Sequence, residues 1–190
     1  QWEVIILTTI QVNDTKLKLI DSLNSLQISK HFCNITVKDI AYHAGISRQA
    51  FYLYFKDKYD LLNWSFTLKS DEIVRAYIDS CPWHTVLAQL METHKKEGIY
   101  TKSLVEYAGQ NSLAKYMEEY TFNTYYKVLR EKYRLSEEKL KDEMFSLKLY
   151  SCGSAKMTVS WVFAGMKEPA DQIAKHLVKS MNLNFIQYFE

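Results

Sequence analysis

The sequence predicts an all-α protein made of a three-helix head followed by a longer helical body. Apolar residues recur at three- and four-residue steps along most of the chain, and strand-like alternation is hard to find. Only five glycines and two prolines interrupt its 190 residues. With 47% hydrophobic residues, the chain can bury one fair-sized core or two small ones. We place the boundary between the head, residues 11–62, and the body, residues 63–190, inside a long connecting helix.

The first predicted helix runs from Asp14 or Thr15 to about Lys30. Its apolar residues repeat at three-residue steps and form one face that can pack on the two helices that follow. These residues are Leu17, Ile20, Leu23 and Leu26.

The next two helices are short and are separated by a glycine. Thr36 stands just before an apolar run at helical spacing and can accept a hydrogen bond from an orphan backbone N–H. Gly45 follows where a left-handed residue ends a helix, and Ser47 can cap a second run. That second run carries Phe51, Tyr52 and Phe55. Helix, glycine turn and helix together predict a helix-turn-helix.

The second helix of such a motif can lie in the major groove of DNA, which admits one α-helix. Arg48 and Gln49 stand at its start, and their side chains can pair bidentately with guanine and adenine respectively. Hydroxyl and ammonium groups suited to phosphate oxygens follow. They belong to Tyr52, Tyr54, Lys56 and Lys58.

The strings T-V-K-D-I-A and A-G-I-S-R-Q-A-F-Y-L-Y-F-K-D-K-Y-D-L-L resemble the DNA-binding domain of the TetR (tetracycline-repressor-like) family of bacterial regulators. The resemblance implies that one set of side chains faces bases or the groove floor: Lys38, Arg48, Gln49 and Leu53. It implies that another set holds phosphates: Thr36, Ser47, Tyr52, Tyr54 and Lys58. The chain departs from the family at His31-Phe32, where a glycine is common, and at Tyr54, where a histidine is common.

A long connector and a body of several helices follow the motif. Asp57 can cap a helix from Lys58 to about Asp79, which Cys81-Pro82-Trp83 ends because the residue before a proline leaves helical geometry. Further helices are expected over Trp83 to Lys96, with Gly98 as the stop, and over Ile99 to Tyr107. A loop at residues 109–112 then leads to a run capped by Ser112 that extends to about Tyr133.

That last run is rich in aromatic residues at helical spacing, which have two interpretations. They can form core, or they can line a pocket in which tyrosine hydroxyls orient a ligand. The predicted pocket or partner surface consists of Tyr107, Tyr116, Tyr120, Phe122 and Tyr126.

Two more helices are expected at the end of the chain. The first, which Ser136 can cap, runs from about Glu137 or Leu140 to Ala164, and Gly165 ends it. The second runs from Pro169 to Tyr188. The first contains the small-residue run 151–155, which permits close helix approach. The family resemblance implies that such a pair forms a four-helix bundle with a second subunit. The tail also resembles a Firmicute subgroup that includes regulators of dihydroxyacetone-kinase operons, in which a partner protein can set activity.

Composition by itself does not indicate a nucleic-acid partner. The net charge is only +2, and residues 1–60 hold seven Lys or Arg against six Asp or Glu. Three widely spaced cysteines, Cys33, Cys81 and Cys152, are expected to be reduced, buried thiols in a cytoplasmic protein. No metal-ligand spacing, phosphate-binding glycine loop, G-x-S-x-G or H-E-x-x-H motif is present, so we expect no metal, no cofactor and no enzyme. The N-terminal apolar run at residues 4–7 is too short to span a membrane.

We therefore predict a sequence-specific DNA-binding transcriptional regulator that binds a double-stranded operator as a homodimer. A small-molecule effector or a protein coregulator would control it through the body. The alternative is a helical coregulator whose head has weak or lost DNA binding.

Overall fold

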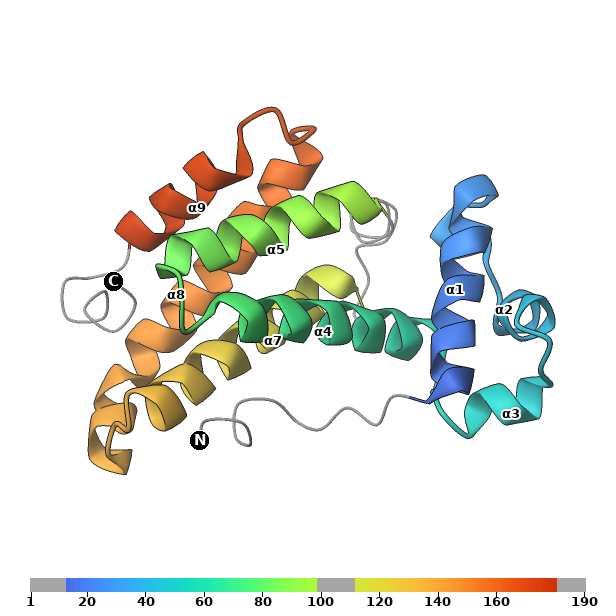
Figure 1. Cartoon of the computed structure of the whole chain (residues 1–190), viewed down its shortest axis with the longest axis horizontal. Helices are drawn as coiled ribbons and strands as arrows, with labels where there is room; N and C mark the ends of the chain where they lie inside the picture. Colours follow the sequence, from blue (N-terminus) through green and yellow to red (C-terminus); the bar gives the residue numbers. More distant parts are fainter. Residues whose placement is uncertain (1–12, 99–111, 181–190) are drawn as a thin grey trace.

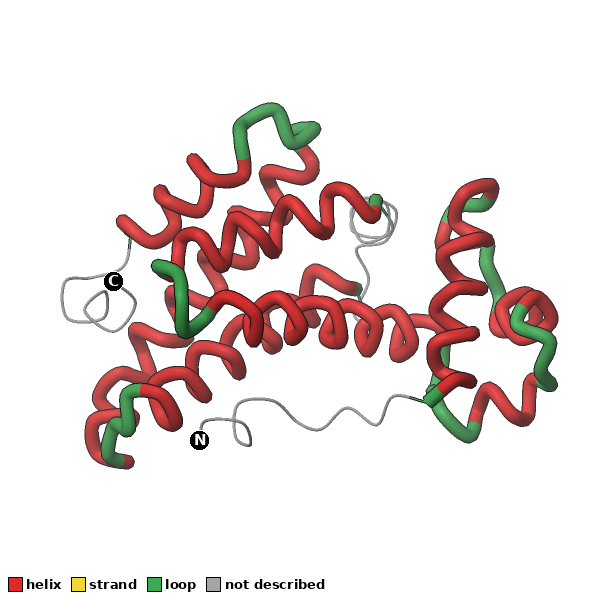
Figure 2. Tube along the Cα trace, viewed as in Figure 1, coloured by secondary structure: helices red, strands yellow, loops and turns green. Residues whose placement is uncertain are grey.

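The computed structural model describes residues 13–98 and 112–180, and within these ranges the chain is helical with no strand (Figures 1 and 2). The head contains α1 (Asp14–Ser29), the 3-10 turn η1 (Phe32–Asn34), α2 (Val37–His43) and α3 (Arg48–Tyr52). The connector is α4 (Lys58–Tyr77), and the body contains α5 (Trp83–Glu97), α7 (Leu113–Lys127), the π-helical turn η2 (Val128–Lys132), α8 (Glu137–Phe163) and α9 (Ala170–Lys179).

The head is a small three-helix unit in which α1 stands across the near end of α4 (Figure 1). Its core is formed by side chains that are at most 1% exposed: Leu19, Leu23, Phe32, Ile40 and Phe51. Ser22 on α1 donates to the carbonyl of Ile40 on α2 at 2.8 Å, which fixes the two helices against each other. These contacts confirm that the predicted first helix packs on the following pair.

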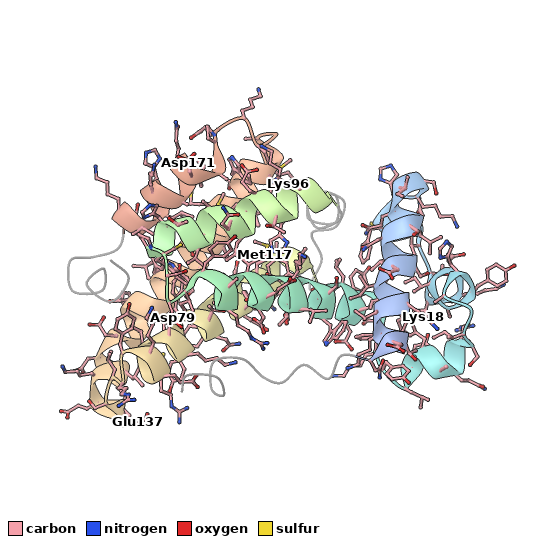
Figure 3. The ribbon with its side chains drawn as sticks, in the orientation of Figure 1. Lys18, Asp79, Lys96, Met117, Glu137 and Asp171 are labelled. Carbon is pink, nitrogen blue, oxygen red and sulfur yellow. The ribbon has the colours of Figure 1, made fainter. Side chains whose placement is uncertain are left out.

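The connector α4 belongs to both parts of the molecule. Asp57 caps it as predicted, accepting from the backbone N–H groups of Tyr59 and Asp60 at 2.8 Å each. Leu61 and Leu62 are buried in the same apolar cluster as the head core, and Phe66 continues that cluster into the body. Lys18 lies in the head and Asp79 lies beyond the opposite end of α4 (Figure 3).

The body stacks α7 along α8, with α9 lying on α5. A second apolar cluster fills the end far from the head, where Trp83 donates its indole N–H to the hydroxyl of Tyr125 at 2.9 Å. The predicted helix ends are confirmed where glycine adopts a positive φ, at Gly98 (+70°) and Gly165 (+81°). The predicted caps of Ser112 and Ser136 are also present.

The structure corrects three details of the sequence analysis. The helix begun by Ser47 ends at Tyr52, so Phe55 is buried just outside α3. The run after Ser112 does not continue as a regular helix, because it changes to a π-helical turn at Val128. Cys33 and Cys152 are exposed rather than buried. The expected helix at 99–107, Tyr107 and the continuation of the last helix to Tyr188 lie outside the described residues.

Within residues 13–98 and 112–180, none of the helices combines the length and the apolar character that crossing a bilayer requires.

Candidate nucleic-acid interface and body cavity

The outward face of α3 presents four exposed side chains, two at the start of the helix and two at its end. Arg48, Gln49 and Tyr52 are exposed, and Leu53, which follows the helix, is 81% exposed. On the opposite side Phe51 is fully buried, so the short helix is anchored by its core face. The arrangement leaves the side chains of Arg48 and Gln49 directed at solvent, as base readout requires.

A glycine turn and a helix cap set the position of α3. Gly45 adopts a φ of +70°, a left-handed conformation that glycine takes at no steric cost. Ser47 then accepts from the N–H of Ala50 at 3.0 Å, which satisfies an orphan donor of the first turn. Since a serine hydroxyl can donate while it accepts, Ser47 can still donate to a phosphate oxygen.

Thr36 and Asp39 form a reciprocal cap at the start of α2. The Thr36 hydroxyl accepts from the Asp39 N–H at 3.1 Å, and the Asp39 carboxylate accepts from the Thr36 N–H at 2.9 Å and from its hydroxyl at 2.8 Å. The hydrogen bonds from Thr36 hold the pKa of Asp39 below its ordinary value. Thr36 is exposed, but its hydroxyl proton is already donated inside the chain. Lys38, the second residue of α2, is exposed.

Lys58 lies at the base of the head rather than on its outer surface. Its ammonium donates to the carbonyls of Phe32, Cys33 and Ile35 at 2.8, 3.1 and 2.7 Å. Burial lowers its pKa, and the nearby Cys33 and Asp57 oppose that shift. Each of the three N–H groups of the ammonium therefore has a backbone carbonyl as its partner. A phosphate contact by Lys58 would replace one of these bonds. Tyr54 is likewise half-buried against the head core.

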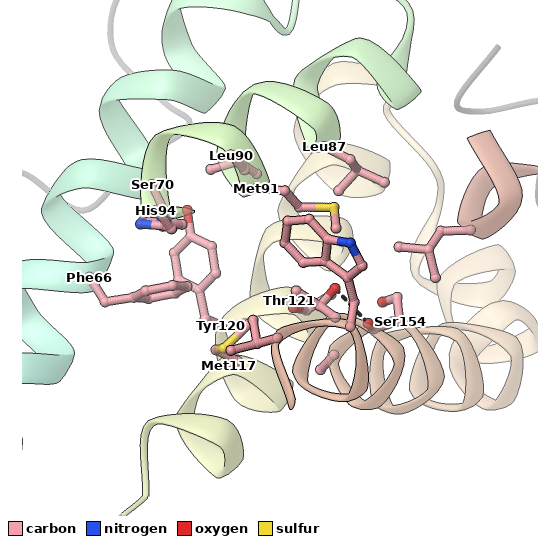
Figure 4. Close-up of a pocket in the computed structure, with 15 residues that line it drawn as sticks. Phe66, Ser70, Leu87, Leu90, Met91, His94, Met117, Tyr120, Thr121 and Ser154 are labelled. Atoms are coloured by element: carbon pink, nitrogen blue, oxygen red, sulfur yellow. Dashed lines mark hydrogen bonds between the residues drawn. The ribbon is translucent and has the colours of Figure 1, made fainter. Parts of the chain in front are cut away.

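A cavity of about 90 Å³ lies inside the body where five helices converge (Figure 4). We call it the body cavity. Its walls come from α4 (Phe66, Ser70), α5 (Leu87, Leu90, Met91), α7 (Met117, Thr121), α8 (Ser154, Val162) and α9 (Leu177), among other residues. Most of the lining is apolar, which is typical of a site that takes a small molecule.

One end of the body cavity is polar. The hydroxyl of Ser70 lies 3.0 Å from Nε2 of His94, whose ring stacks on Phe66 with 4.7 Å between centroids. Burial, with a smaller contribution from the Lys69 ammonium, lowers the pKa of His94 to about 3, so its imidazole is neutral at physiological pH. Ser70, His94 and Tyr120 lie together at this end (Figure 4).

A buried carboxyl group stands behind the same end. Tyr120 donates its hydroxyl to Asp71 at 2.8 Å, and Asp71 is only 5% exposed. Burial raises the pKa of Asp71, which the bond from Tyr120 partly offsets. Burial and the neighbouring Asp71 raise the pKa of Tyr120 well above its ordinary value, so the phenol stays protonated.

The described aromatic residues that were predicted to line a pocket do not all line the body cavity. Tyr120 lines the body cavity. Tyr116, one turn earlier, bonds instead to Thr67 on α4 at 2.6 Å. Phe122 and Tyr126 stack on each other in the second apolar cluster, 6.1 Å between ring centroids. Tyr107 is outside the described residues.

Comparison of the sequence with known families settles the class of protein. The sequence model described as "Bacterial regulatory proteins, tetR family" matches residues 27–63, which hold α2 and α3. A second model, described as "Transcriptional regulator C-terminal region" of the TetR group, matches residues 82–183, more than half of the chain. The chain belongs to the TetR family. It is therefore a transcriptional regulator with a DNA-binding N-terminal part and a regulatory C-terminal part.

Three solved structures share the fold of this TetR-family chain at low identity. The dihydroxyacetone kinase operon activator DhaS is 22% identical with a TM-score of 0.62, over 93% of this chain and 98% of that one. The fatty acid degradation regulator FadR from Bacillus halodurans is 17% identical with a TM-score of 0.56, over 88% and 94%. The TetR family repressor AlkX from Dietzia sp. strain DQ12-45-1b is 18% identical with a TM-score of 0.52, over 88% and 98%. No curated protein sequence matches the chain.

The sequence analysis missed most of the body cavity. Ser70 and His94 are 24 residues apart, and no local pattern joins them. One signal was present in the small-residue run 151–155: Ser154 and Ala155 face the cavity, while Cys152 and Gly153 on the same turn are exposed. A run of small side chains inside a long helix can therefore indicate a cavity beside the helix as well as close helix packing.

Proposed function

We propose that this TetR-family regulator binds its operator as a homodimer and reads base edges with Arg48 and Gln49 of α3. The observation that carries the proposal is the outward direction of these two side chains from a helix fixed by the Ser47 cap and by buried Phe51. Lys38, Leu53 and Tyr52 extend the same exposed surface, and Ser47 and Lys56 would add phosphate contacts. We propose no catalytic activity for the protein. We propose that it acts in the cytoplasm, where its operator DNA lies.

The proposed dimer uses the outward face of α8. Four large apolar side chains on this helix are exposed by more than half: Phe145 (77%), Leu149 (65%), Met157 (57%) and Phe163 (56%). A second copy would remove them from water, since a monomer rarely leaves such a row uncovered. The described part of α9 does not present a comparable row of exposed apolar side chains. Its apolar residues Ala174, Leu177 and Val178 are buried within the same chain, and its outer side carries an Asp171–Lys175 ion pair at 3.3 Å.

A dimer also meets a geometric need of DNA recognition. One recognition helix contacts only a few base pairs, so useful specificity requires two half-sites related by the two-fold axis of the protein. Analytical ultracentrifugation would test the interface with Leu149→Glu, which should convert the protein to a monomer. Gln172→Glu on the outer side of α9 is the matched control and should leave the dimer intact. A wild-type monomer at micromolar concentration that binds operator tightly would contradict the proposal.

Base readout is tested on DNA that flanks the gene of this protein, with footprinting to define the operator. Arg48→Ala and Gln49→Ala should each cost roughly 1–3 kcal/mol on the operator and much less on scrambled DNA, because each loses a base-edge pair. Arg75→Ala and Gln172→Ala, in the exposed body, are matched controls and should change neither affinity. Equal loss on both DNAs would show that α3 does not read bases. Absence of binding by the folded wild-type dimer to any flanking DNA would favour the coregulator alternative.

We further propose that the body controls DNA binding through a small molecule or a protein partner. The support is the body cavity, which opens between α4 and the helices that pack on it. A ligand changes DNA affinity only if it binds the DNA-competent and incompetent states unequally. Phe66 and Ser70 of α4 line the cavity, while Leu61 and Leu62 of the same helix are buried in the head cluster, so α4 is the element that would transmit this difference.

A further inference from the structure

The chemistry of the body cavity defines the class of ligand that can enter it. Among residues 13–98 and 112–180, none of the side chains that line it is an Asp, Glu, Lys or Arg. The imidazole of His94 is neutral at physiological pH because burial holds its pKa at about 3. An ionic ligand would lose its hydration here without gaining a counter-charge from these residues, which is unfavourable.

The buried carboxyl behind the cavity disfavours an anion in particular. Asp71 lies within one hydrogen bond of Tyr120, whose ring lines the cavity. Tyr120 donates its only proton to Asp71 and so cannot donate it to a ligand carboxylate. The negative field of Asp71, where it is ionised, would repel a second negative charge in the same low-dielectric region. Carboxylates and phosphates therefore do not match this site.

The polar end nevertheless offers hydrogen bonds to a neutral oxygen. The Ser70 hydroxyl can donate once and accept twice, and its bonds to His94 and Tyr120 use two of these positions and leave one for a ligand. The Tyr120 oxygen retains lone pairs that can accept from a ligand hydroxyl. An alcohol or a ketone oxygen is thus satisfied at this end. The rest of the cavity is mostly apolar, with side chains such as Leu90 and Met117. The hydroxyl groups of Ser154 and Thr158 also line it, but both already donate to backbone carbonyls of α8.

The volume limits the size of the ligand. An apolar cavity of about 150 Å³ accommodates benzene, so about 90 Å³ corresponds to roughly four heavy atoms in the present shape. Met91 and Met117 line the cavity, and methionine changes rotamer readily, so a molecule of five or six heavy atoms can be accommodated.

We propose that the body cavity binds a small, uncharged molecule with a short apolar chain and one hydroxyl or carbonyl oxygen, which Ser70 on α4 contacts. The ligand class is thus that of short-chain alcohols and ketones. This inference rests on the proposed function, because it names the effector of the same regulatory site.

Four probes with the same number of heavy atoms separate the effect of charge from that of size: 1-pentanol, 2-pentanone, butanoate and pentylammonium. Binding to the dimer would be followed by the fluorescence of Trp161, which lines the cavity, and by the thermal midpoint. The alcohol and the ketone should bind saturably at millimolar concentrations, at least about tenfold more tightly than either ion. Butanoate binding as tightly as 1-pentanol, or no saturable binding of either neutral probe to the folded protein, would overturn the inference.

Two variants locate the binding in this cavity. Ser70→Ala should weaken 1-pentanol about tenfold, the loss expected for one buried hydrogen bond, whereas Ser25→Ala on the exposed surface of α1 should not. Ala155→Leu should abolish binding by filling the cavity, and Ala164→Leu, at an exposed position beyond α8, is its control. Unchanged 1-pentanol affinity in both Ser70→Ala and Ala155→Leu would place the ligand elsewhere and overturn the inference.

The probe titrations test the ligand class separately from the proposed DNA binding. Probe titrations contain no operator, and operator titrations contain no probe. Loss of probe binding with intact operator binding would overturn only the ligand class, and intact probe binding without operator binding would overturn only the proposed DNA readout.

Discussion

Polar side chains in the head mostly close the ends of nearby helices, whereas those in the body bond across helices that are distant in sequence. Thr36 with Asp39 and Ser47 with Ala50 are bonds over three residues. Thr67 with Tyr116 and Asp71 with Tyr120 each span 49 residues. Local caps specify a helix geometry almost independently of the rest of the chain, so the head is suited to hold a fixed reading surface. The body depends on helix-to-helix contacts and keeps a cavity among them, so its packing can respond to a ligand.

The head core should show the largest effect of any single change. Phe51→Ala removes a fully buried ring and should cost about 3–5 kcal/mol, because a small three-helix unit cannot close the space that is left. Urea denaturation followed by circular dichroism would measure the loss. Tyr52→Ala, at the adjacent and half-exposed position, is the control and should change stability far less. Similar losses for the two variants would mean that the head is not organised around this core.

Lys58 tests a long-range polar contact that holds the base of the head together. Lys58→Met removes the ammonium from three backbone carbonyls and should cost on the order of 2–3 kcal/mol, since carbonyl partners of a charged donor are left unsatisfied. We expect the salt dependence of DNA binding to keep its slope. The exposed Lys56 is the matched position: Lys56→Met should keep stability and lower the slope by about one unit. A lower slope for Lys58→Met with unchanged thermal stability would instead assign Lys58 to phosphate.

The body should respond to acid through His94. Its pKa is about 3 when folded against an ordinary 6.5, so only the unfolded chain gains a proton between these values. Stability should therefore fall as pH drops from 6.5 towards 3, by up to about 1.4 kcal/mol per pH unit. Asp71 acts in the opposite direction, because its raised pKa makes the folded state the stronger proton binder. The difference between wild type and His94→Gln isolates the histidine, and parallel stability curves for the two would refute the assignment.

Helix caps provide the smallest effects and a direct head-to-body comparison. Thr36→Ala removes a reciprocal cap and should cost about 1 kcal/mol. Ser136→Ala removes a single bond of 3.3 Å at the start of α8 and should cost no more than about half of that, because the 27-residue helix is held mainly by its buried face. Thermal unfolding would measure both. An equal or larger loss for Ser136→Ala would contradict the view that local caps matter more in the head.

Much of the fold could be predicted because its helix ends are encoded by adjacent residues. Ser47, Asp57, Ser112 and Ser136 each precede an apolar run, and each caps the helix that follows. The end of α3 could not be predicted in the same way. Tyr54 and Phe55 still bond back to the carbonyl of Phe51, but Asp60 accepts from the N–H of Lys56 and the chain turns into α4.

The body cavity was harder to predict because periodicity shows which face of a helix is buried but not which helix covers it. Tyr116 and Tyr120 occupy equivalent positions one turn apart, yet only Tyr120 lines the cavity. The π-helical turn at Val128–Lys132 was also unexpected. Its wider turn accompanies the burial of two successive residues, Val128 and Leu129, while Lys132 donates to the carbonyl of Ile78 at 2.7 Å. Such contacts depend on tertiary context that no local pattern contains.

Because α4 is long, a small rotation of this helix produces a large displacement at its head end. Its 20 residues span about 30 Å, and Phe66 and Ser70 stand about 12 and 18 Å from the head end. A rotation of only about 5° about the far end would carry the head end through about 2.6 Å. In a two-fold pair the two recognition helices would then separate by up to about 5 Å, roughly one and a half base-pair steps of a duplex whose half-sites lie about 34 Å apart. A displacement of about one ångström where Phe66 and Ser70 meet the cavity corresponds to several degrees of rotation of this helix. The proposed ligand, although only a few atoms in size, would thus move both heads of the proposed dimer out of phase with the groove.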